Sequence, residues 1–490
     1  MTTSLILPAV ILLPFVGGLA AFFMGRREGW PLGTFSLGIT AGAFVLAIRV
    51  AGLVTRTDAL MYQVGSIPLS ADRMTALLLL VFSGLFVVIM LFAQGLIDHE
   101  IRSKVVPHYY GVCLILLAAL MGVTLSQDLF TMYLFLEVVA VCAGALVAAK
   151  GDKPALEAAL RYLLMSMLGS AMLIMGLAGL YMSTGSFNLA VLAQTLPQAV
   201  SGHSLATMAG IALVFVGIAV KAALFPLHSW LPHAHGSAAT PSSVVISALL
   251  VKVNIVFLFK FMIQVLQAGF IHQLPLRPIL LALSVGAILG GSLMALKQTD
   301  IKRMLAYSTV AQVGYIFLGL GIMNETALLG TLYHVLNHAV VKGMLVLAAG
   351  SIMKLTGRRR IADFAGVGRR FPLPMVAFTV GALSMVGVPP LSGFASKWYL
   401  GIGALEEGQP VFLAVLLVSS VLNALYYLPV VVAAFFRSDE NIEQHMELPL
   451  GAKVSMVALA AACLLLGLFS HAAVGYIQPA VHRLFLGGGA

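Results

Sequence analysis

The chain has 490 residues, of which 60% are hydrophobic and only 9% are charged, and its mean hydropathy is +1.03. This composition lies far outside the range of soluble globular domains and predicts a protein whose solvent is lipid. The formal net charge of +10 does not indicate nucleic acid binding, because the basic residues stand at the ends of apolar stretches and not along one polar face.

Apolar stretches that could cross a bilayer recur along the whole chain. A helix needs about 20 predominantly apolar residues to span the hydrocarbon core. We therefore predict an all-α integral membrane protein with about 14 transmembrane helices. The expected spans are 4–24, 32–54, 73–96, 108–126, 128–149, 157–183, 205–230, 241–266, 276–296, 302–322, 325–353, 372–400, 411–436 and 451–475.

The loops between these spans alternate in charge. The odd-numbered loops contain most of the Lys and Arg residues, including Arg26, Arg27 and Lys150, and the even-numbered loops contain few. Because cytoplasmic loops are enriched in Lys and Arg, we expect a multi-pass protein of the inner (plasma) membrane with both termini on the non-cytoplasmic side. The seventh loop, around His233 and His235, has no Lys or Arg and is the one gap in this pattern.

Prolines interrupt the seventh and twelfth expected spans in a similar way. Pro226 follows Lys221, and Pro389 with Pro390 precedes Lys397. A proline removes a backbone donor and leaves carbonyls that must line a cavity or find other partners at membrane depth. The breaks are five spans apart, which predicts two inverted five-helix repeats. Because a lysine accompanies each break, we interpret both breaks as functional and not as simple kinks.

The repeats divide the chain into four expected parts. Residues 1–107 form an N-terminal three-helix region and residues 437–490 form a C-terminal helix region. Residues 108–266 are the first inverted repeat and residues 276–436 are the second, and we expect one half-channel in each.

Several ionisable residues are expected deep inside the spans. A charge at the bilayer centre costs at least about 2.5 kcal/mol, so each one needs a functional or structural reason. Glu137 is the only carboxylate well inside a span, which makes it the expected partner of Lys221, either in proton transfer or as a static ion pair. Lys260 is closer to a helix end and is expected to reach the surface. The deep residues are Glu137, Lys221, Lys252, Lys342 and Lys397.

Histidines extend this set. His334, His338 and Lys342 are spaced by four residues, so they share one face of the eleventh expected helix. Neutral imidazole both donates and accepts a hydrogen bond, which suits a proton relay. The histidines beyond the seventh-span break are secondary candidates for the same path: His228, His233 and His235.

Other site classes have little support in the sequence. A metal at His334 and His338 is not expected, because no carboxylate or cysteine accompanies them and Lys342 would repel the cation. No nucleotide-binding motif is present, and we predict no bound cofactor.

Four strings of the sequence resemble the antiporter-like subunits shared by respiratory complex I, membrane-bound hydrogenases and Mrp-type Na⁺/H⁺ antiporters. The string VGVPPLSGFASKW at 386–398, with a lysine after PPLSGF, resembles the Mrp D-type subunit most. Two departures are visible: the family usually reads WLPDAH where this chain has His233, and TPVS where this chain reads TPSS at 240–243. The strings are FPLHSWLPHAH at 225–235, LKQTDIKRMLAYSTVAQVGY at 296–315, HVLNHAVVKGMLVLAAG at 334–350 and VGVPPLSGFASKW at 386–398.

The resemblance implies roles for the residues already selected. Glu137 would pair with Lys221 in the first half-channel, Lys252 with the nearby histidines would link the halves, and Lys397 would lead to the far exit. The chain would then translocate H⁺ within a hetero-oligomeric membrane complex, which leaves open whether Na⁺ moves and whether the host is an NADH:quinone oxidoreductase-like or hydrogenase-like translocase. An independent secondary transporter of a small solute is the alternative hypothesis.

Overall fold

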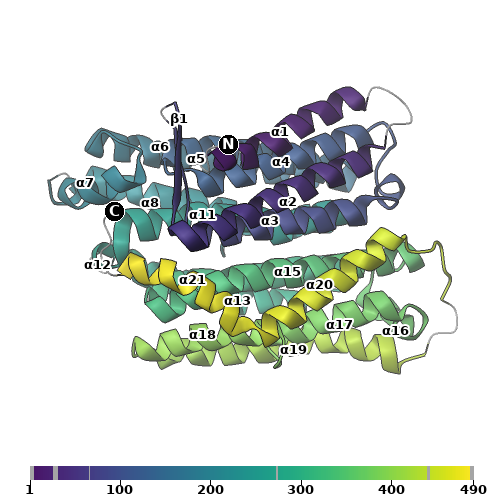
Figure 1. The fold of residues 1–490 in the computed structure, drawn as a ribbon. Helices are drawn as coiled ribbons and strands as arrows, with labels where there is room; N and C mark the ends of the chain where they lie inside the picture. Colours follow the sequence, from purple (N-terminus) through teal and green to yellow (C-terminus); the bar gives the residue numbers. More distant parts are fainter. Residues whose placement is uncertain are drawn as a thin grey trace.

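The computed structural model describes residues 5–25, 31–65, 67–202, 204–271, 274–438 and 442–485. Arg26 and Arg27, used above for the charge pattern, lie outside these ranges. Long helices dominate the structure, and the N-terminal and C-terminal halves form two bundles side by side (Figure 1).

The N-terminal half begins with three long helices and a β-hairpin. Its centre is one continuous helical stretch, Thr240–Leu266, which contains two π-helical turns. The elements are α1 (Ile6–Met24), α2 (Leu32–Thr57), β1 (Leu60–Val64), β2 (Ile67–Ala71), α3 (Arg73–Ala93), η2 (Ile97–His99), α4 (Val106–Leu125), α5 (Leu129–Ala148), α6 (Lys153–Thr184), α7 (Leu189–Gly202), α8 (Ser204–Lys221), α9 (Trp230–Ser237), α10 (Thr240–Val244), η3 (Val245–Leu250), α11 (Val251–Lys260), η4 (Phe261–Leu266) and α12 (Gln267–Ile271).

The C-terminal half contains the second set of long helices. Its longest helix has 32 residues. The elements are α13 (Leu276–Leu296), α14 (Ile301–Ile322), α15 (Glu325–Thr356), η5 (Ile361–Phe364), α16 (Val367–Arg370), α17 (Pro372–Val386), α18 (Ser392–Glu406), α19 (Pro410–Phe436), α20 (Leu450–Leu468) and α21 (Ser470–Phe485).

The expectation of an all-α membrane protein is confirmed. Within the described residues, 12 helices are long and apolar enough to cross a membrane, and two shorter apolar helices are Leu205–Lys221 and Pro372–Val386. Those two belong to the interrupted spans: α8 ends at Lys221 and α9 begins at Trp230, while α17 ends at Val386 and α18 begins at Ser392. The prolines therefore lie in the breaks, where no helical donor is needed.

Some elements differ from the expectation. The antiparallel hairpin of β1 and β2, paired from Leu60 with Ala71 to Val64 with Ile67, follows α2 on the side where α3 begins. The fourteenth span was expected to run from 451 to 475, but α20 ends at Leu468 and a separate helix, α21, begins at Ser470.

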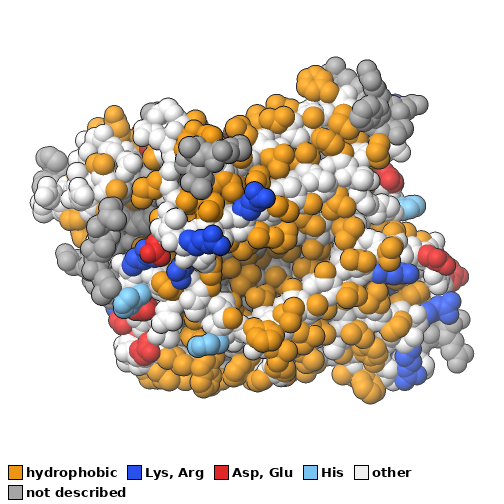
Figure 2. Space-filling view, viewed as in Figure 1, with side chains coloured by type: hydrophobic (Ala, Val, Ile, Leu, Met, Phe, Trp, Pro, Cys, Tyr) orange, Lys and Arg blue, Asp and Glu red, His pale blue; other side chains and the backbone are white. Residues whose placement is uncertain are grey.

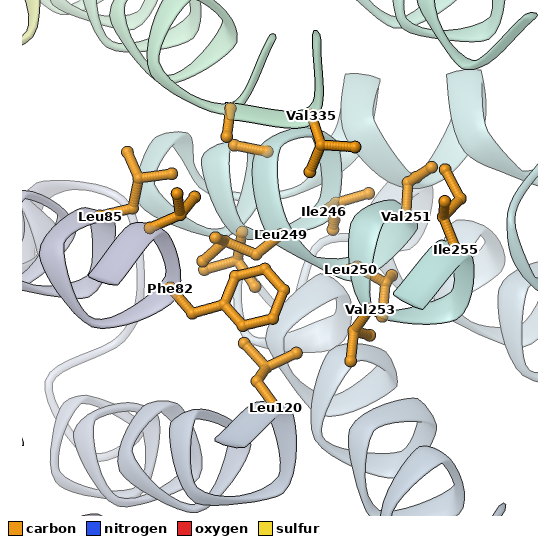
Figure 3. Packing of buried hydrophobic residues seen from close by; sticks show 14 of the residues in the cluster. Phe82, Leu85, Leu120, Ile246, Leu249, Leu250, Val251, Val253, Ile255 and Val335 are labelled. Carbon is orange, nitrogen blue, oxygen red and sulfur yellow. The ribbon is translucent and has the colours of Figure 1, made fainter. Parts of the chain in front are cut away.

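The centre of the molecule is packed from both halves. All of the most apolar 18-residue window of Thr240–Leu266 is buried, and 94% of the corresponding window of α15 is buried. Figure 3 shows Leu249 and Leu250 of η3 among Phe82 of α3, Leu120 of α4 and Val335 of α15. Spans enclosed in this way can hold ionisable side chains, because the neighbours of those side chains are protein groups and not lipid.

Candidate functional site

An ion pair links α5 to the end of α8. The Lys221 Nζ atom donates to Glu137 Oε1 at 3.0 Å, and the side chains are 3% and 34% exposed, respectively. The Ser170 hydroxyl from α6 lies 2.7 and 2.8 Å from the two Glu137 oxygens. The expected Glu137–Lys221 pairing is therefore present, and Ser170 orients its carboxylate.

The end of α8 is held by a residue that the sequence analysis missed. Asn254 of α11 donates to the backbone carbonyl of Lys221 at 3.2 Å and to that of Leu250 at 2.9 Å. A cavity of about 10 Å³ lies here, lined by Lys221, Asn254 and Trp230 among others. A cavity of that volume has room for about one water molecule. Asn254 therefore links the helix end that carries Lys221 to α11, which also carries the buried Lys252.

Lys252 lies two residues before Asn254 and is fully buried. Its Nζ atom donates to the carbonyl of Ser247 at 2.5 Å. Ser247 belongs to the π-helical segment η3, and π-turns change the backbone pairing of a helix and are frequent at functional sites. The Ser247 hydroxyl in turn lies 2.8 Å from the Thr309 hydroxyl of α14, so η3 contacts the C-terminal half at this point.

The histidines of α15 form a stacked pair in the interior. The His334 and His338 ring centroids are 5.7 Å apart with an angle of 15° between the ring planes. His334 Nδ1 lies 3.0 Å from the Ser396 hydroxyl of α18, while His334 Nε2 and both nitrogens of His338 have no hydrogen-bond partner within the described residues. Free ring nitrogens in a buried line are what a relay through intervening water requires.

Lys342 continues the same face of α15. Its Nζ atom donates to the Leu305 carbonyl at 2.8 Å and to the Ser308 hydroxyl, both on α14. The Tyr427 hydroxyl of α19 is 3.4 Å from Lys342 Nζ and 2.9 Å from Ser308 Oγ. Lys342 is therefore stabilised by neutral oxygen atoms from two neighbouring helices.

Lys397 of α18 lies against the second break. Its Nζ atom donates to the carbonyls of Met385 and Val386 at 2.9 and 3.0 Å, and to Ser420 Oγ at 2.8 Å. Asn423 of α19 also donates to the Met385 carbonyl, at 2.9 Å. An asparagine therefore holds a carbonyl at the end of α17 just as Asn254 holds the end of α8. Lys397 also interacts electrostatically with His334.

The three secondary histidines fall into two environments. His228 and His235 are buried, and His228 Nδ1 and both His235 ring nitrogens lack partners within the described residues. His233 instead lies near the surface, 3.3 Å from Arg161 Nη1, with its Nδ1 atom 2.9 Å from the Ser229 carbonyl. The structure thus separates His233 from the buried line.

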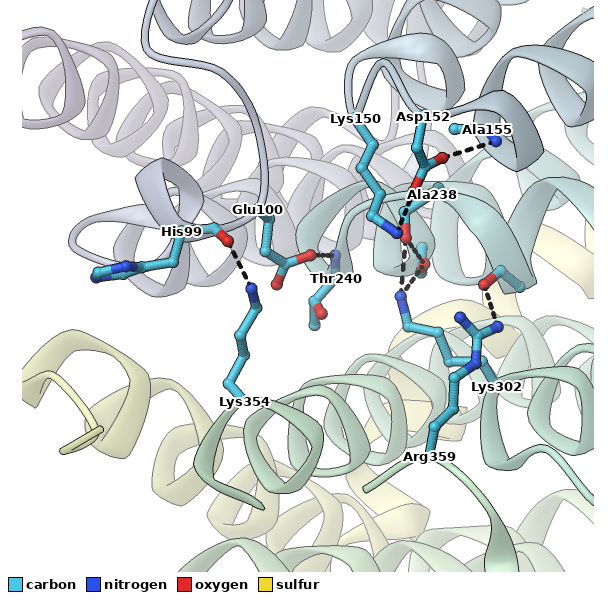
Figure 4. Close-up of polar contacts among 12 residues, drawn as sticks. His99, Glu100, Lys150, Asp152, Ala155, Ala238, Thr240, Lys302, Lys354 and Arg359 are labelled. Atoms are coloured by element: carbon cyan, nitrogen blue, oxygen red, sulfur yellow. Dashed lines mark hydrogen bonds and ion pairs between the residues drawn. The ribbon is translucent and has the colours of Figure 1, made fainter. Parts of the chain in front are cut away.

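A polar cluster surrounds the junction of α9 and α10 (Figure 4). Buried Lys302 donates to the Ala238 carbonyl at 2.8 Å, Glu100 accepts from the Thr240 backbone at 2.6 Å, and Arg359 donates to the Gly236 carbonyl at 2.7 Å. The seventh loop, which has no Lys or Arg of its own, is therefore contacted by basic side chains from neighbouring parts of the chain. Lys302 lies in the first turn of α14, a position from which a lysine usually reaches water, so its burial could not be predicted from the sequence.

The expectation for Lys260 was wrong. Its side chain is fully buried and does not reach the surface. The Nζ atom donates to the carbonyls of Thr124 and Ser126 at 2.6 and 2.7 Å. These carbonyls end α4, where backbone acceptors lack helical partners and the helix dipole favours a cation. Lys260 therefore caps a neighbouring helix.

No group of three His, Cys, Asp or Glu side chains gathers as a metal site would require within the part of the chain that the structure describes. The cations of the site instead contact carbonyl, hydroxyl and carboxylate oxygens. A line of groups that can hold a proton thus runs from α5 through α8, α11 and α15 to α18.

Comparisons with known proteins identify this arrangement. NADH-quinone oxidoreductase subunit N of Desulforudis audaxviator is 41% identical over 381 residues, 74% of either chain. The D-type subunit of the Na⁺/H⁺ antiporter of Alkalihalophilus pseudofirmus is 29% identical over 476 residues, 95% of this chain and 94% of the relative.

The fold is similar to that of a chain in the archaeal membrane-bound sulfane sulfur reductase, with a TM-score of 0.89, 28% identity, and coverage of 98% of this chain and 97% of that one. The family model described as NADH:quinone oxidoreductase/Mrp antiporter, transmembrane, matches residues 126–423, more than half of the chain. This chain therefore belongs to the transmembrane family shared by NADH:quinone oxidoreductases and Mrp antiporters.

Proposed function

We propose that the chain moves protons along the buried line that starts at the Glu137–Lys221 pair and ends at Lys397. The observation that carries the proposal is the sequence of contacts across both halves of the molecule. Asn254 joins the end of α8 to α11, the His334 and His338 rings stack on α15, and Tyr315 stacks on His334 while its ring lies 5.4 Å from Lys397 Nζ. Side chains at this depth are retained at a cost, which favours a transport role over packing alone.

The charge distribution along the line suggests how a proton is driven. Lys221 has a carboxylate partner, whereas Lys252, Lys342 and Lys397 are bonded to carbonyl and hydroxyl oxygens within the described residues. Movement of Glu137 away from Lys221 removes the strongest stabilisation of the ammonium form. The proton then passes toward Lys252, and return of Glu137 resets the pair.

Residues 108–266 and 276–436 act in this proposal as two inverted half-channels, with residues 1–107 and 437–490 as the flanking regions. The matching roles of Asn254 and Asn423 at the two breaks support that division. The side on which Lys150, Lys302, Lys354 and Arg359 gather would face the cytoplasm of a cell with the chain in its plasma membrane. Both termini would then lie on the opposite side.

The size of the site argues against an organic solute as the cargo. The cavity beside Lys221 and Asn254 has a volume of about 10 Å³, whereas pockets for small molecules typically have volumes of about 300–1,000 Å³. A proton relay needs only side chains and single waters, so the geometry favours proton transfer over a carrier of small solutes.

The names of the relatives suggest partners and a second ion. One relative is a subunit of an NADH-quinone oxidoreductase and another is a subunit of a Na⁺/H⁺ antiporter. We propose that this chain likewise works among other membrane subunits, driven either by a redox partner or by an opposing Na⁺ gradient.

The test is to purify the native complex through a tag on this chain and reconstitute it in liposomes with a trapped pH dye. Proton movement under an imposed membrane potential or Na⁺ gradient, abolished by Lys221→Met, is the expected result. Co-purified subunits with iron-sulfur clusters would identify a redox-driven host, and small membrane subunits alone would identify an Mrp-type host. A chain that purifies alone and carries an organic solute would overturn the proposal.

A further inference from the structure

An apolar groove lies on the surface between the two halves, outside the proton line. It has a volume of about 610 Å³. Figure 2 shows this face as a hollow covered with hydrophobic side chains, with basic side chains near one end. The lining comes from α2, α3, α15, α20 and α21, and it includes Leu77, Leu80, Leu336, Val340, Ala462 and Ala473.

One end of the groove is aligned with an arginine. Arg73 is four residues before Leu77 on α3, so it shares the helix face that continues along the groove through Leu80 and Gly84. Arg73 Nε is buried and has no hydrogen-bond partner within the described residues. The Arg73 guanidinium therefore lies at the end of the groove where α3 begins, which we call the mouth of the groove.

Two arginines at the mouth of the groove share one carboxylate. Arg73 Nη2 and Arg483 Nη2 share a single carboxylate oxygen, Asp58 Oδ1, at 3.6 and 2.9 Å. Asp72 accepts from the Thr75 backbone and caps α3, and Glu325 is paired with His482, whose Nδ1 atom lies 3.0 Å from Glu325 Oε2. An anion between Arg73 and Arg483 would complete the pairing.

The groove itself is suited to a hydrocarbon chain. Its apolar walls offer no partners to water, so a hollow of this size at membrane depth is filled by something apolar. A transmembrane helix about 10 Å wide and 30 Å long occupies roughly 2,400 Å³, several times the volume of the groove. A helix would therefore lie across the opening, whereas an acyl chain fits inside.

We propose that the groove holds one acyl chain of a phospholipid with an anionic headgroup, whose phosphate is bound by Arg73 and Arg483. Lipid tails are as apolar as leucine, so the acyl chain gains little by leaving the bilayer. Retention comes from the arginines, which bind phosphate through charge-assisted and bidentate hydrogen bonds.

A lipid in the groove would contact α15, the helix that carries His334 and His338. Leu336 and Val340 of α15 line the groove. His334 and His338 are each offset from them by two residues, which places the histidines on the opposite face of the same helix. The acyl chain would therefore support α15 from the lipid side. The binding site does not depend on proton transport, so it stands if the proposed function fails.

The first test compares two neighbouring alanines of α20. Ala462 lines the groove, whereas exposed Ala461 does not. Native mass spectrometry of the purified complex is expected to show a bound phospholipid that is reduced at least tenfold by Ala462→Phe and unchanged by Ala461→Phe. Equal lipid retention in both variants would overturn the proposal, and so would a partner subunit's helix cross-linked into the groove through a cysteine at 462.

The second test addresses the headgroup. The complex is delipidated and mixed with vesicles of phosphatidylglycerol or phosphatidylcholine. The wild-type complex is expected to retain the phosphatidylglycerol at least tenfold more, and Arg73→Gln to lose that preference. Lys453→Gln, which removes an exposed basic residue from the opposite end of α20, serves as the control and keeps the preference. No preference in the wild-type complex, or an unchanged preference in Arg73→Gln, would refute the headgroup assignment.

Discussion

Replacement of Glu137 by glutamine tests whether the ion pair with Lys221 works in transport or only in packing. The variant keeps a side-chain oxygen for the Ser170 hydroxyl but removes the charge that faces Lys221 at 3.0 Å. A hydrogen bond to a charged group contributes about 1.5–3 kcal/mol. Because Glu137 is 34% exposed, solvent screens the pair and the lower value applies, about 1.5 kcal/mol. In the variant the ammonium form of Lys221 loses that stabilisation, so the proton-loaded state is populated roughly tenfold less and proton movement slows in proportion.

The assay is dye-monitored proton uptake into liposomes containing the purified complex under a potassium diffusion potential. Glu407→Gln is the control, since Arg277 and Glu407 form an ion pair of comparable exposure, 17% and 26%, away from the proton line. We expect Glu137→Gln to slow uptake roughly tenfold with the complex still assembled, and Glu407→Gln to leave uptake unchanged. If Glu137→Gln keeps the wild-type rate, or loses rate only in proportion to lost assembly, the pair is structural and the reasoning fails.

Three further predictions concern the rest of the line. Lys397→Met is expected to stop proton uptake while subunit composition on native gels stays normal, because the variant removes the last proton-holding group of the proposed line; sustained uptake would exclude Lys397 from the path. His338→Leu is expected to slow uptake at least about tenfold, since leucine fills the site without a proton acceptor; an unchanged rate would place the path elsewhere. Asn254→Leu is expected to lower the free energy of unfolding by about 1–3 kcal/mol, because the Lys221 carbonyl loses its donor. Asn423→Leu should cost a comparable amount, because the Met385 carbonyl keeps Lys397 as a donor but the buried Tyr426 hydroxyl loses its acceptor, Asn423 Oδ1. Thermal melting of the two variants compares them.

The sequence allowed the long apolar elements to be predicted with few errors, and Lys221, Lys252 and Lys342 are buried as expected, whereas Glu137 and Lys397 are partly exposed. Hydropathy over about 20 residues is a strong signal, and each expected span coincides with at least one helix. The burial cost of charge singled out Glu137 and Lys221 as partners, and the structure places them 3.0 Å apart. The roles of these residues in transport remain predictions.

Small polar residues could not be selected in the same way. Ser170 and Asn254 complete the site, but serine and asparagine recur along the spans and often serve helix packing. Their roles follow from which helices are neighbours, and this is a tertiary property. The π-helical turn at Ser247, which provides the acceptor for Lys252, likewise leaves no clear mark in the residue pattern.

The environment of Lys260 and the hairpin of β1 and β2 were missed for related reasons. A lysine near a helix end usually reaches water, but here the end of α4 covers it and supplies two carbonyl acceptors. The hairpin is short and lies between two long apolar spans, so its alternating pattern is weak beside theirs.

The central claim is that protons cross between the two halves at Lys252, and α11 offers a matched pair of lysines for testing it. Lys252 and Lys260 are both fully buried on this helix and both donate to backbone carbonyls, but Lys252 donates within η3, beside the C-terminal half, whereas Lys260 donates to the end of α4. The decisive measurement is proton uptake by liposomes containing assembled complex with Lys252→Met or Lys260→Met. We expect Lys252→Met to abolish uptake and Lys260→Met to lower thermal stability but keep uptake. Wild-type uptake by Lys252→Met would show that protons do not cross at Lys252.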